Sequence, residues 1–290
     1  MVAWKDGYWW SKDGLRLHYR DYAGAGLPIL CIPGLTRNAR DFAAVADRLA
    51  GRHRLILVEL RGRGESAASK DPMSYVPPTY LDDIQILIDE LALDRFILFG
   101  TSLGGLLSML IAAVNIGKIA GIVINDIGPV IEPKGLARIR GYVGRSASYP
   151  TWLHAARSLA GTQRVNYPDY TLEQWLEMAK RVCRLTSAGR IVHDYDPAIA
   201  EPFRAMEPPA DVDMWPLLSA LKHVPGLLLR GAISDVLSDA TARRMVDECP
   251  QLERVDVPRI GHAPTLFEPE SVAAIDRLLA RIGAAKDFGG

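Results

Sequence analysis

Short, wholly apolar runs alternate with amphipathic stretches along most of this 290-residue chain. Apolar runs bounded by turn residues are typical of parallel strands that helices cover on both faces. The stretch 80–93 between two such runs repeats its apolar residues on one helical face. This alternation predicts βαβ units and a mostly parallel sheet. The clearest strand candidates are ILCI (29–32), LILV (55–58), FILF (96–99) and IVI (122–124).

The alternation stops once, between residue 127 and about residue 216, where helix-like pieces are separated by proline and glycine turns. It then resumes with the strand candidates VPGLLLRG (224–231) and ERVDV (253–257) and a final helix candidate at 268–282. We therefore expect one sheet domain, built from residues 1–127 and 217–290, with a helical cap inserted at 128–216.

Charge and cysteine content exclude several classes of protein. Lys plus Arg equals Asp plus Glu at 34 each, so there is no overall field that would attract nucleic acid or an anionic membrane. The three cysteines are far apart and odd in number, which argues against a disulfide framework or a zinc site. Charges and a glycine interrupt the first residues, so we expect no signal peptide there, and no apolar run is long enough to span a bilayer. We expect a cytoplasmic protein.

Ser102 lies in GTSLG, between the strand candidate RFILFG and the helix candidate LGGLLSMLIAAVN. A serine on such a sharp turn has its Oγ at the carboxyl edge of the sheet, and the flanking glycines relieve the crowding of the turn. The following helix directs its free amides toward the same place. We expect Ser102 to be a nucleophile rather than a helix-capping serine.

A serine hydroxyl needs a base, and a carboxylate to orient that base. His262, in GHAP between the last strand and the last helix, fits the base. Two carboxylates follow strands and could orient it: Asp235 in AISDVLS and Asp126 in VINDIGP. We favour Asp235, because its strand directly precedes the histidine-bearing unit, and we keep Asp126 as the alternative acid.

An acyl-transfer site also needs backbone amides for the oxyanion of the tetrahedral intermediate. The expected donors are the N–H of Leu103, after the nucleophile, and the N–H of Leu35, in the loop after LPILCIPG.

Two other segments suggest chemistry that their residues do not support. ELRGRGES (59–66) lacks the ending that grips phosphates, so we expect a solvated structural turn. Asp82 and Asp83 are neighbours in a helix and point about 100° apart, so they cannot converge on one ion. We expect no metal.

Ser102, Asp235 and His262, in that order, together with PGL, LRGRGES, GTSLGG, SD and GHAP, resemble the α/β-hydrolase fold family. The resemblance covers essentially the whole chain. It implies an eight-stranded sheet, a helical cap after the sixth strand, and serine-dependent hydrolysis without a cofactor. One departure is Pro33, where family members usually carry a histidine before the glycine of the oxyanion loop.

The predicted function is hydrolysis of a small carboxylic ester or lactone whose acyl or aromatic group enters an apolar pocket under the cap. Related enzymes that open epoxides or displace halide carry an aspartate on the sharp turn where this chain has Ser102, so the serine disfavours those reactions. One alternative is carbon–carbon bond hydrolysis of ring-cleavage diketones by the same serine machinery. A second is a non-catalytic ligand receptor on this scaffold.

Overall fold

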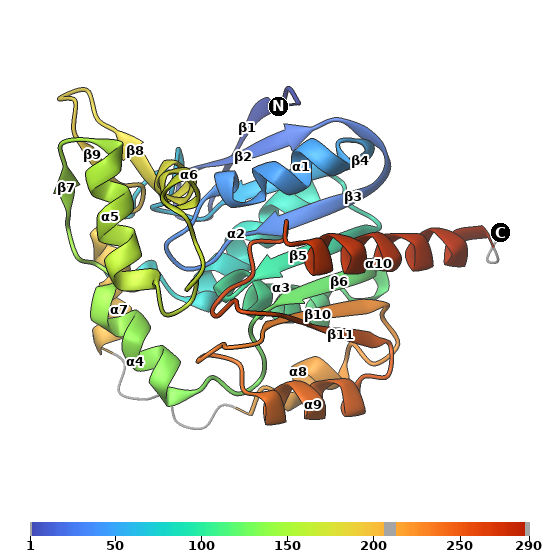
Figure 1. Ribbon diagram of the computed structural model, residues 1–290. Helices are drawn as coiled ribbons and strands as arrows, with labels where there is room; N and C mark the ends of the chain where they lie inside the picture. Colours follow the sequence, from blue (N-terminus) through green and yellow to red (C-terminus); the bar gives the residue numbers. More distant parts are fainter. Residues whose placement is uncertain (1, 206–212, 288–290) are drawn as a thin grey trace.

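The computed structural model describes residues 2–205 and 213–287. Its centre is an eight-stranded sheet with strand order β1-β2-β4-β3-β5-β6-β10-β11 (Figure 1). β2 is antiparallel to both of its neighbours, and the other pairs are parallel. The expected mostly parallel, eight-stranded sheet is therefore confirmed. Its strands are β1 (Lys5–Trp10), β2 (Arg16–Tyr22), β3 (Gly24–Ile32), β4 (Gly51–Glu59), β5 (Phe96–Thr101), β6 (Ile119–Asn125), β10 (Gly226–Gly231) and β11 (Leu252–Val257).

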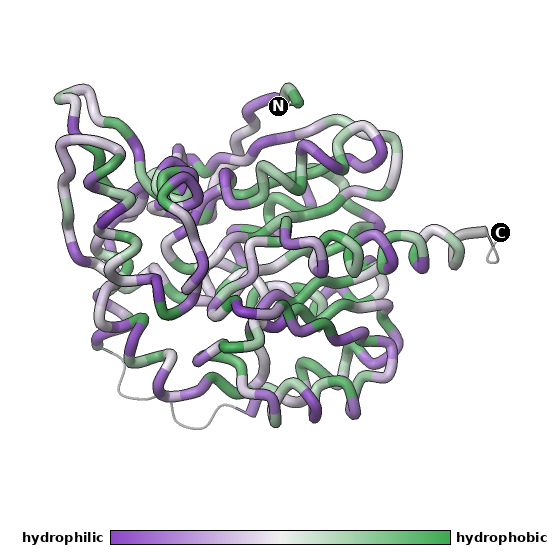
Figure 2. The backbone as a smooth tube through the Cα atoms, viewed as in Figure 1, coloured by the Kyte–Doolittle hydropathy of each residue, from purple (hydrophilic) through white to green (hydrophobic). Residues whose placement is uncertain are grey.

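Helices cover both faces of the sheet, which explains why its central strands are apolar throughout. On one face lie α1 (Ala43–Leu49) and α10 (Pro269–Asp287). The other face packs against α2 (Pro77–Glu90), α3 (Leu103–Val114), α8 (Trp215–Ser219) and α9 (Asp239–Glu248). Figure 2 shows apolar residues concentrated along the central strands and on the inner sides of these helices.

Short 3₁₀ turns connect several elements: η1 (Ala39–Phe42), η2 (Pro72–Ser74) and η3 (Ile116–Lys118) in the sheet domain, and η4 (Pro197–Ile199) between β6 and β10.

A helical insertion, named the cap here for its place in the chain, lies between β6 and β10, on one side of the sheet (Figure 1). Its helices are α4 (Pro133–Tyr142), α5 (Trp152–Gln163), α6 (Leu172–Val182) and α7 (Ala200–Ala205). It also holds a small sheet of β7 (Ser148–Tyr149), β9 (Ile191–His193) and β8 (Cys183–Leu185), which the sequence did not reveal because such short strands have no readable periodicity. Residues 206–212, which fall within the cap expected at 128–216, lie outside the described residues.

The three cysteines are all buried free thiols. In the described ranges, no helix is long and apolar enough to cross a membrane. Within the same ranges, no group of three or more His, Cys, Asp or Glu side chains is placed to hold a metal ion.

Candidate active site

Ser102 occupies a sharp turn between β5 and α3, with a φ of 54° and a ψ of −118°. The flanking glycines are required by close approaches. A Cβ on Gly104 would lie 1.9 Å from the carbonyl oxygen of Ile32, and one on Gly100 would lie 2.3 Å from the carbonyl oxygen of Gly104. Glycine at both positions therefore lets α3 pack close against the strands that carry the turn.

Ser102, His262 and Asp126 form a continuous hydrogen-bonded chain. The Ser102 Oγ lies 2.8 Å from His262 Nε2, and His262 Nδ1 lies 2.8 Å from Asp126 Oδ2. Because a carboxylate can only accept hydrogen bonds, the His262 ring carries its proton on Nδ1 and donates it to Asp126. Its Nε2 atom then accepts a hydrogen bond from the Ser102 hydroxyl. The ring is thus in the tautomer that a general base for Ser102 requires.

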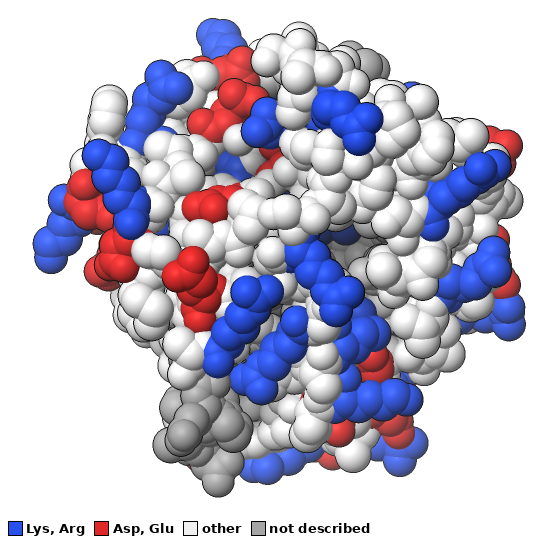
Figure 3. Space-filling model, turned by 90° about the vertical axis from the view of Figure 1, so that its left-hand side faces the viewer, with Lys and Arg blue, Asp and Glu red and all other residues white. Residues whose placement is uncertain are grey.

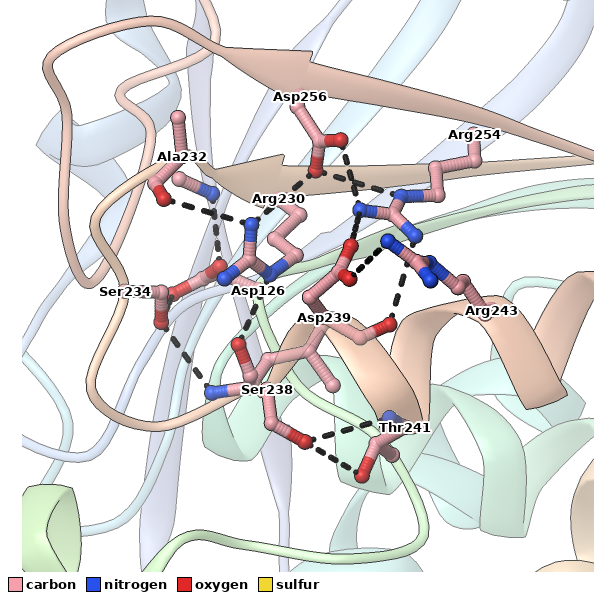
Figure 4. Close-up of polar contacts among 12 residues, drawn as sticks. Asp126, Arg230, Ala232, Ser234, Ser238, Asp239, Thr241, Arg243, Arg254 and Asp256 are labelled. Carbon is pink, nitrogen blue, oxygen red and sulfur yellow. Dashed lines mark hydrogen bonds and ion pairs between the residues drawn. The ribbon is translucent and has the colours of Figure 1, made fainter.

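Asp126 is fully buried immediately after β6, and its carboxylate has two further donors. The Gly231 N–H donates to Oδ1 at 2.8 Å, and the Ser234 hydroxyl donates to Oδ2 at 2.6 Å. The close-up in Figure 4 shows Asp126 beside Ser234 and Arg230 at the ends of β6 and β10. Arg230 braces this loop by donating to the carbonyl oxygens of Leu237 and Ala232.

Asp235 does not hold the His262 ring, so the expectation that favoured it over Asp126 is corrected. Its carboxylate accepts two hydrogen bonds from Arg138 of α4, from Nε at 2.6 Å and from Nη2 at 2.7 Å. Burial raises the pKa of Asp235, but the hydrogen bonds and charge of Arg138 lower it more, so its pKa lies below the ordinary value. Asp235 therefore links the sheet domain to the cap.

Two cap residues that the sequence analysis missed hold the loop that carries His262. The side-chain oxygen of Asn166 accepts a hydrogen bond from the His262 N–H at 3.2 Å. The backbone carbonyl oxygen of Asn166 accepts one from the Gly261 N–H at 2.7 Å. The Tyr167 hydroxyl donates to the carbonyl oxygen of Ala263 at 2.7 Å. Both residues follow α5 and are buried. The cap thus helps to set the position of the histidine, which sequence spacing alone gives no means to detect.

Leu35 and Leu103 both line the cavity that holds Ser102. Within the described residues, neither backbone N–H is a donor in the hydrogen bonds of turns, loops and caps. The Leu35 loop is held by Arg63, whose Nε donates to the Leu35 carbonyl oxygen at 2.9 Å. Arg63 thus anchors the loop whose usual histidine is replaced here by Pro33.

Most of the ELRGRGES turn is buried, contrary to the expectation of a solvated turn, although Glu65 is exposed. Arg61 and Arg63 are each 1% exposed. Arg61 donates to the carboxylates of Asp83 and Asp13, and Arg63 donates to the Tyr80 hydroxyl at 3.0 Å. Charged side chains are rarely this buried unless they are paired, so the turn is a buried support for the site.

A cavity of about 580 Å³ lies between the cap and the carboxyl edge of the sheet, with Ser102 and His262 in its wall. This volume suits a small organic ligand. Its wall combines apolar side chains with aromatic ones, among them Phe42, Phe203 and six tyrosines. Trp175 is buried in a separate core within the cap itself. The tyrosines are Tyr75, Tyr80, Tyr142, Tyr149, Tyr167 and Tyr195.

Comparisons with known proteins agree with this fold. The model of the alpha/beta hydrolase family matches residues 29–275, and the chain therefore belongs to that family. It is 33% identical over 273 residues to the 3-hydroxybutyrate-oligomer hydrolase of Cupriavidus necator, covering 91% of this chain and 92% of that one. It is 27% identical to the N-formylmaleamate deformylase of Pseudomonas putida, over 87% of this chain and 88% of the relative.

Among solved structures, an alpha/beta hydrolase from Novosphingobium aromaticivorans superposes with a TM-score of 0.93 at 54% identity, over 97% of this chain and 99% of the other. The hydrolase relatives and the family together identify the protein as a hydrolase.

Proposed function

We propose that this hydrolase cleaves carboxylic esters or lactones through an acyl-enzyme on Ser102. The observation that carries the proposal is the chain Ser102 Oγ to His262 Nε2 to Asp126, with 2.8 Å at each step. These distances are within the range for proton transfer from a nucleophile to its base. The absence of a histidine beside the oxyanion loop is offset by Arg63.

In the proposed reaction, the Ser102 oxygen attacks the ester carbonyl carbon while His262 Nε2 takes its proton. The N–H groups of Leu35 and Leu103 donate to the oxyanion that forms. The intermediate collapses, and His262 returns the proton to the departing alcohol. Water then attacks the acyl-enzyme, its proton goes to His262 and on to Ser102, and the carboxylic acid leaves. Asp126 keeps the ring oriented and stabilises its charged form.

The relative from Cupriavidus necator supports an ester of a hydroxy acid as the substrate type, because its name specifies 3-hydroxybutyrate oligomers. The apolar and tyrosine-lined wall of the cavity supports a short hydrocarbon substituent on such an ester.

A substrate panel tests this proposal. Purified protein is assayed against short p-nitrophenyl esters, lactones, hydroxy-acid ester dimers and a coloured ring-cleavage diketone, with Ser102→Ala as the blank. We expect ester turnover that the substitution abolishes while the thermal midpoint stays unchanged. Turnover of the diketone alone would favour carbon–carbon hydrolysis. Failure of a fluorophosphonate to label Ser102 would favour the non-catalytic receptor.

A further inference from the structure

The cavity wall carries more positive than negative charge. In the part of the chain that the structure describes, Asp41 is its one carboxylate, beside four arginines, Arg37, Arg140, Arg145 and Arg181. Asp41 is already occupied, because Arg37 donates to it from Nε at 2.5 Å and from Nη2 at 2.8 Å. Arg140, Arg145 and Arg181 therefore have no carboxylate partner among the described residues that line the cavity. A confined site lined by charge of one sign attracts ligands of the opposite sign.

Arg140, in α4, is the best placed of the three to bind a ligand. Its guanidinium carbon lies 5.2 Å from the centre of the Phe203 ring. Its Nε is buried and has no hydrogen-bond partner among the described residues. A buried donor without an acceptor is unfavourable, and an anionic oxygen would relieve it. Stacking on an aromatic face holds the guanidinium plane and leaves its edge free for a carboxylate.

The surroundings of Arg140 favour an amphiphilic ligand. Leu136 and Ile139 of the same helix also line the cavity, so a hydrocarbon chain could lie along α4 and end at Arg140. Arg145, which is exposed, adds a second positive charge at the cavity wall. Figure 3 shows the cap side of the molecule, where several Lys and Arg side chains gather just below the centre of the face, with Asp and Glu side chains beside them.

Arg181 is a weaker candidate for the same role. It lies over the Phe267 ring at 5.0 Å, and its Nε is also buried without a partner among the described residues. However, its guanidinium already interacts with the Tyr170 hydroxyl, and its charge counteracts the rise in the pKa of that hydroxyl caused by burial. The Arg181 side chain is therefore less available to a ligand than that of Arg140.

We propose that the substrate is an anionic ester, with a carboxylate separated from the scissile carbonyl by a short hydrocarbon segment, and that Arg140 binds this carboxylate. The inference rests on the proposed ester hydrolysis and narrows its substrate class. A free hydroxy-acid ester dimer and a monoester of a dicarboxylic acid both have this form. A neutral ester of the same length would leave the guanidinium without an acceptor.

Matched pairs of substrates test the inference. One pair is mono-p-nitrophenyl glutarate and its methyl ester, with the charge on the acyl side. The other is 3-butyryloxybutyrate and its methyl ester, with the charge on the alcohol side. For at least one pair we expect kcat/KM to favour the acid by about tenfold or more, mainly through KM, as for a charge-assisted hydrogen bond. The preference should weaken as salt is added.

Substitutions assign the effect to Arg140. In Arg140→Gln the preference for the acid should disappear, whereas kcat/KM for the neutral twin should fall far less. Arg140→Lys should keep part of the preference for the acid, since lysine has the positive charge but not the planar guanidinium that can bind a carboxylate through two hydrogen bonds. Arg157→Gln is the matched control: it removes one charge from an exposed position on α5 that does not line this cavity. It should leave the preference intact, and thermal midpoints check that each variant is folded.

The outcomes separate this inference from the proposed function. If wild-type protein hydrolyses both members of each pair equally, or if Arg140→Gln keeps the preference, the inference is wrong while ester hydrolysis stands. If wild-type protein hydrolyses none of the four esters and none of the esters and lactones of the substrate panel, the proposed function fails. Calorimetric binding of glutarate monomethyl ester and of neutral dimethyl glutarate to Ser102→Ala protein then decides the inference: tighter binding of the acid supports it, and equal binding refutes it.

Discussion

Replacing Asp126 with Asn tests which carboxylate serves the histidine. In the native site, Asp126 Oδ1 accepts from the Gly231 N–H, and Oδ2 accepts from both Ser234 and His262. An asparagine must turn its oxygen toward Gly231, because that N–H can only donate. Its NH₂ group then faces His262 Nδ1, which must become an acceptor. The ring proton moves to Nε2, and the ring no longer accepts the proton of Ser102.

The expected effect of Asp126→Asn is large and specific to the chemical step. Loss of the correct tautomer lowers kcat by about 10⁴-fold in serine hydrolases, which corresponds to about 5 kcal/mol of transition-state stabilisation. The matched variant is Asp235→Asn, which breaks the link to Arg138 and leaves the histidine untouched. We expect its kcat to stay within about tenfold of wild type, because no interaction with the reacting groups is removed.

The assay is steady-state hydrolysis of p-nitrophenyl butyrate, with far-UV circular dichroism and thermal midpoints as controls for folding. The reasoning is refuted if Asp235→Asn loses the activity and Asp126→Asn keeps it. Comparable losses in both folded variants would also contradict it, since the carboxylate hydrogen-bonded to His262 in the structure is that of Asp126.

Three further predictions concern the support of the site. Asn166→Ala should lower kcat more than the thermal midpoint, because the His262 loop loses an acceptor; an unchanged kcat would show that the loop holds itself. Gly104→Ala should destabilise the protein by about 1–3 kcal/mol or more in urea unfolding, because its Cβ would lie 1.9 Å from the Ile32 oxygen; full stability and activity would contradict that close approach. Burial lowers the pKa of His18, but Glu59 and Asp6 raise it more, so its folded pKa is raised. The stabilisation from its charge is complete below the unfolded pKa of about 6.5 and is lost as pH rises through the folded pKa. His18→Gln should therefore cost more stability at pH 6 than at pH 9, and an equal cost at both would refute the effect.

The sequence predicted the fold well because its signals are local. Continuous apolar runs in the sequence correspond to the strands β3, β4, β5 and β6. The glycines Gly100 and Gly104, which flank Ser102, are required by the close packing of α3 on β5. The place of the insertion between β6 and β10 and the hydrogen bond between Ser102 and His262 are consistent with this pattern.

The choice between Asp126 and Asp235 could not be predicted, because both carboxylates follow strands that end at the same edge of the sheet. The two differ in a contact between residues far apart in the sequence, because Arg138 in the cap donates hydrogen bonds to Asp235. The burial of Arg61 and Arg63 was missed for the same reason, since their partners Asp83 and Tyr80 lie in a helix whose docking the sequence does not specify.

A direct test of the proposed mechanism is to trap the acyl-enzyme. Protein is mixed with excess p-nitrophenyl butyrate and quenched with acid during turnover, and its mass is measured intact and after digestion. The account predicts a mass increase equal to one butyryl group in place of a proton, located on the peptide that contains Ser102, and absent in Ser102→Ala. Turnover with no added mass, or a butyryl group on a different residue, would contradict it.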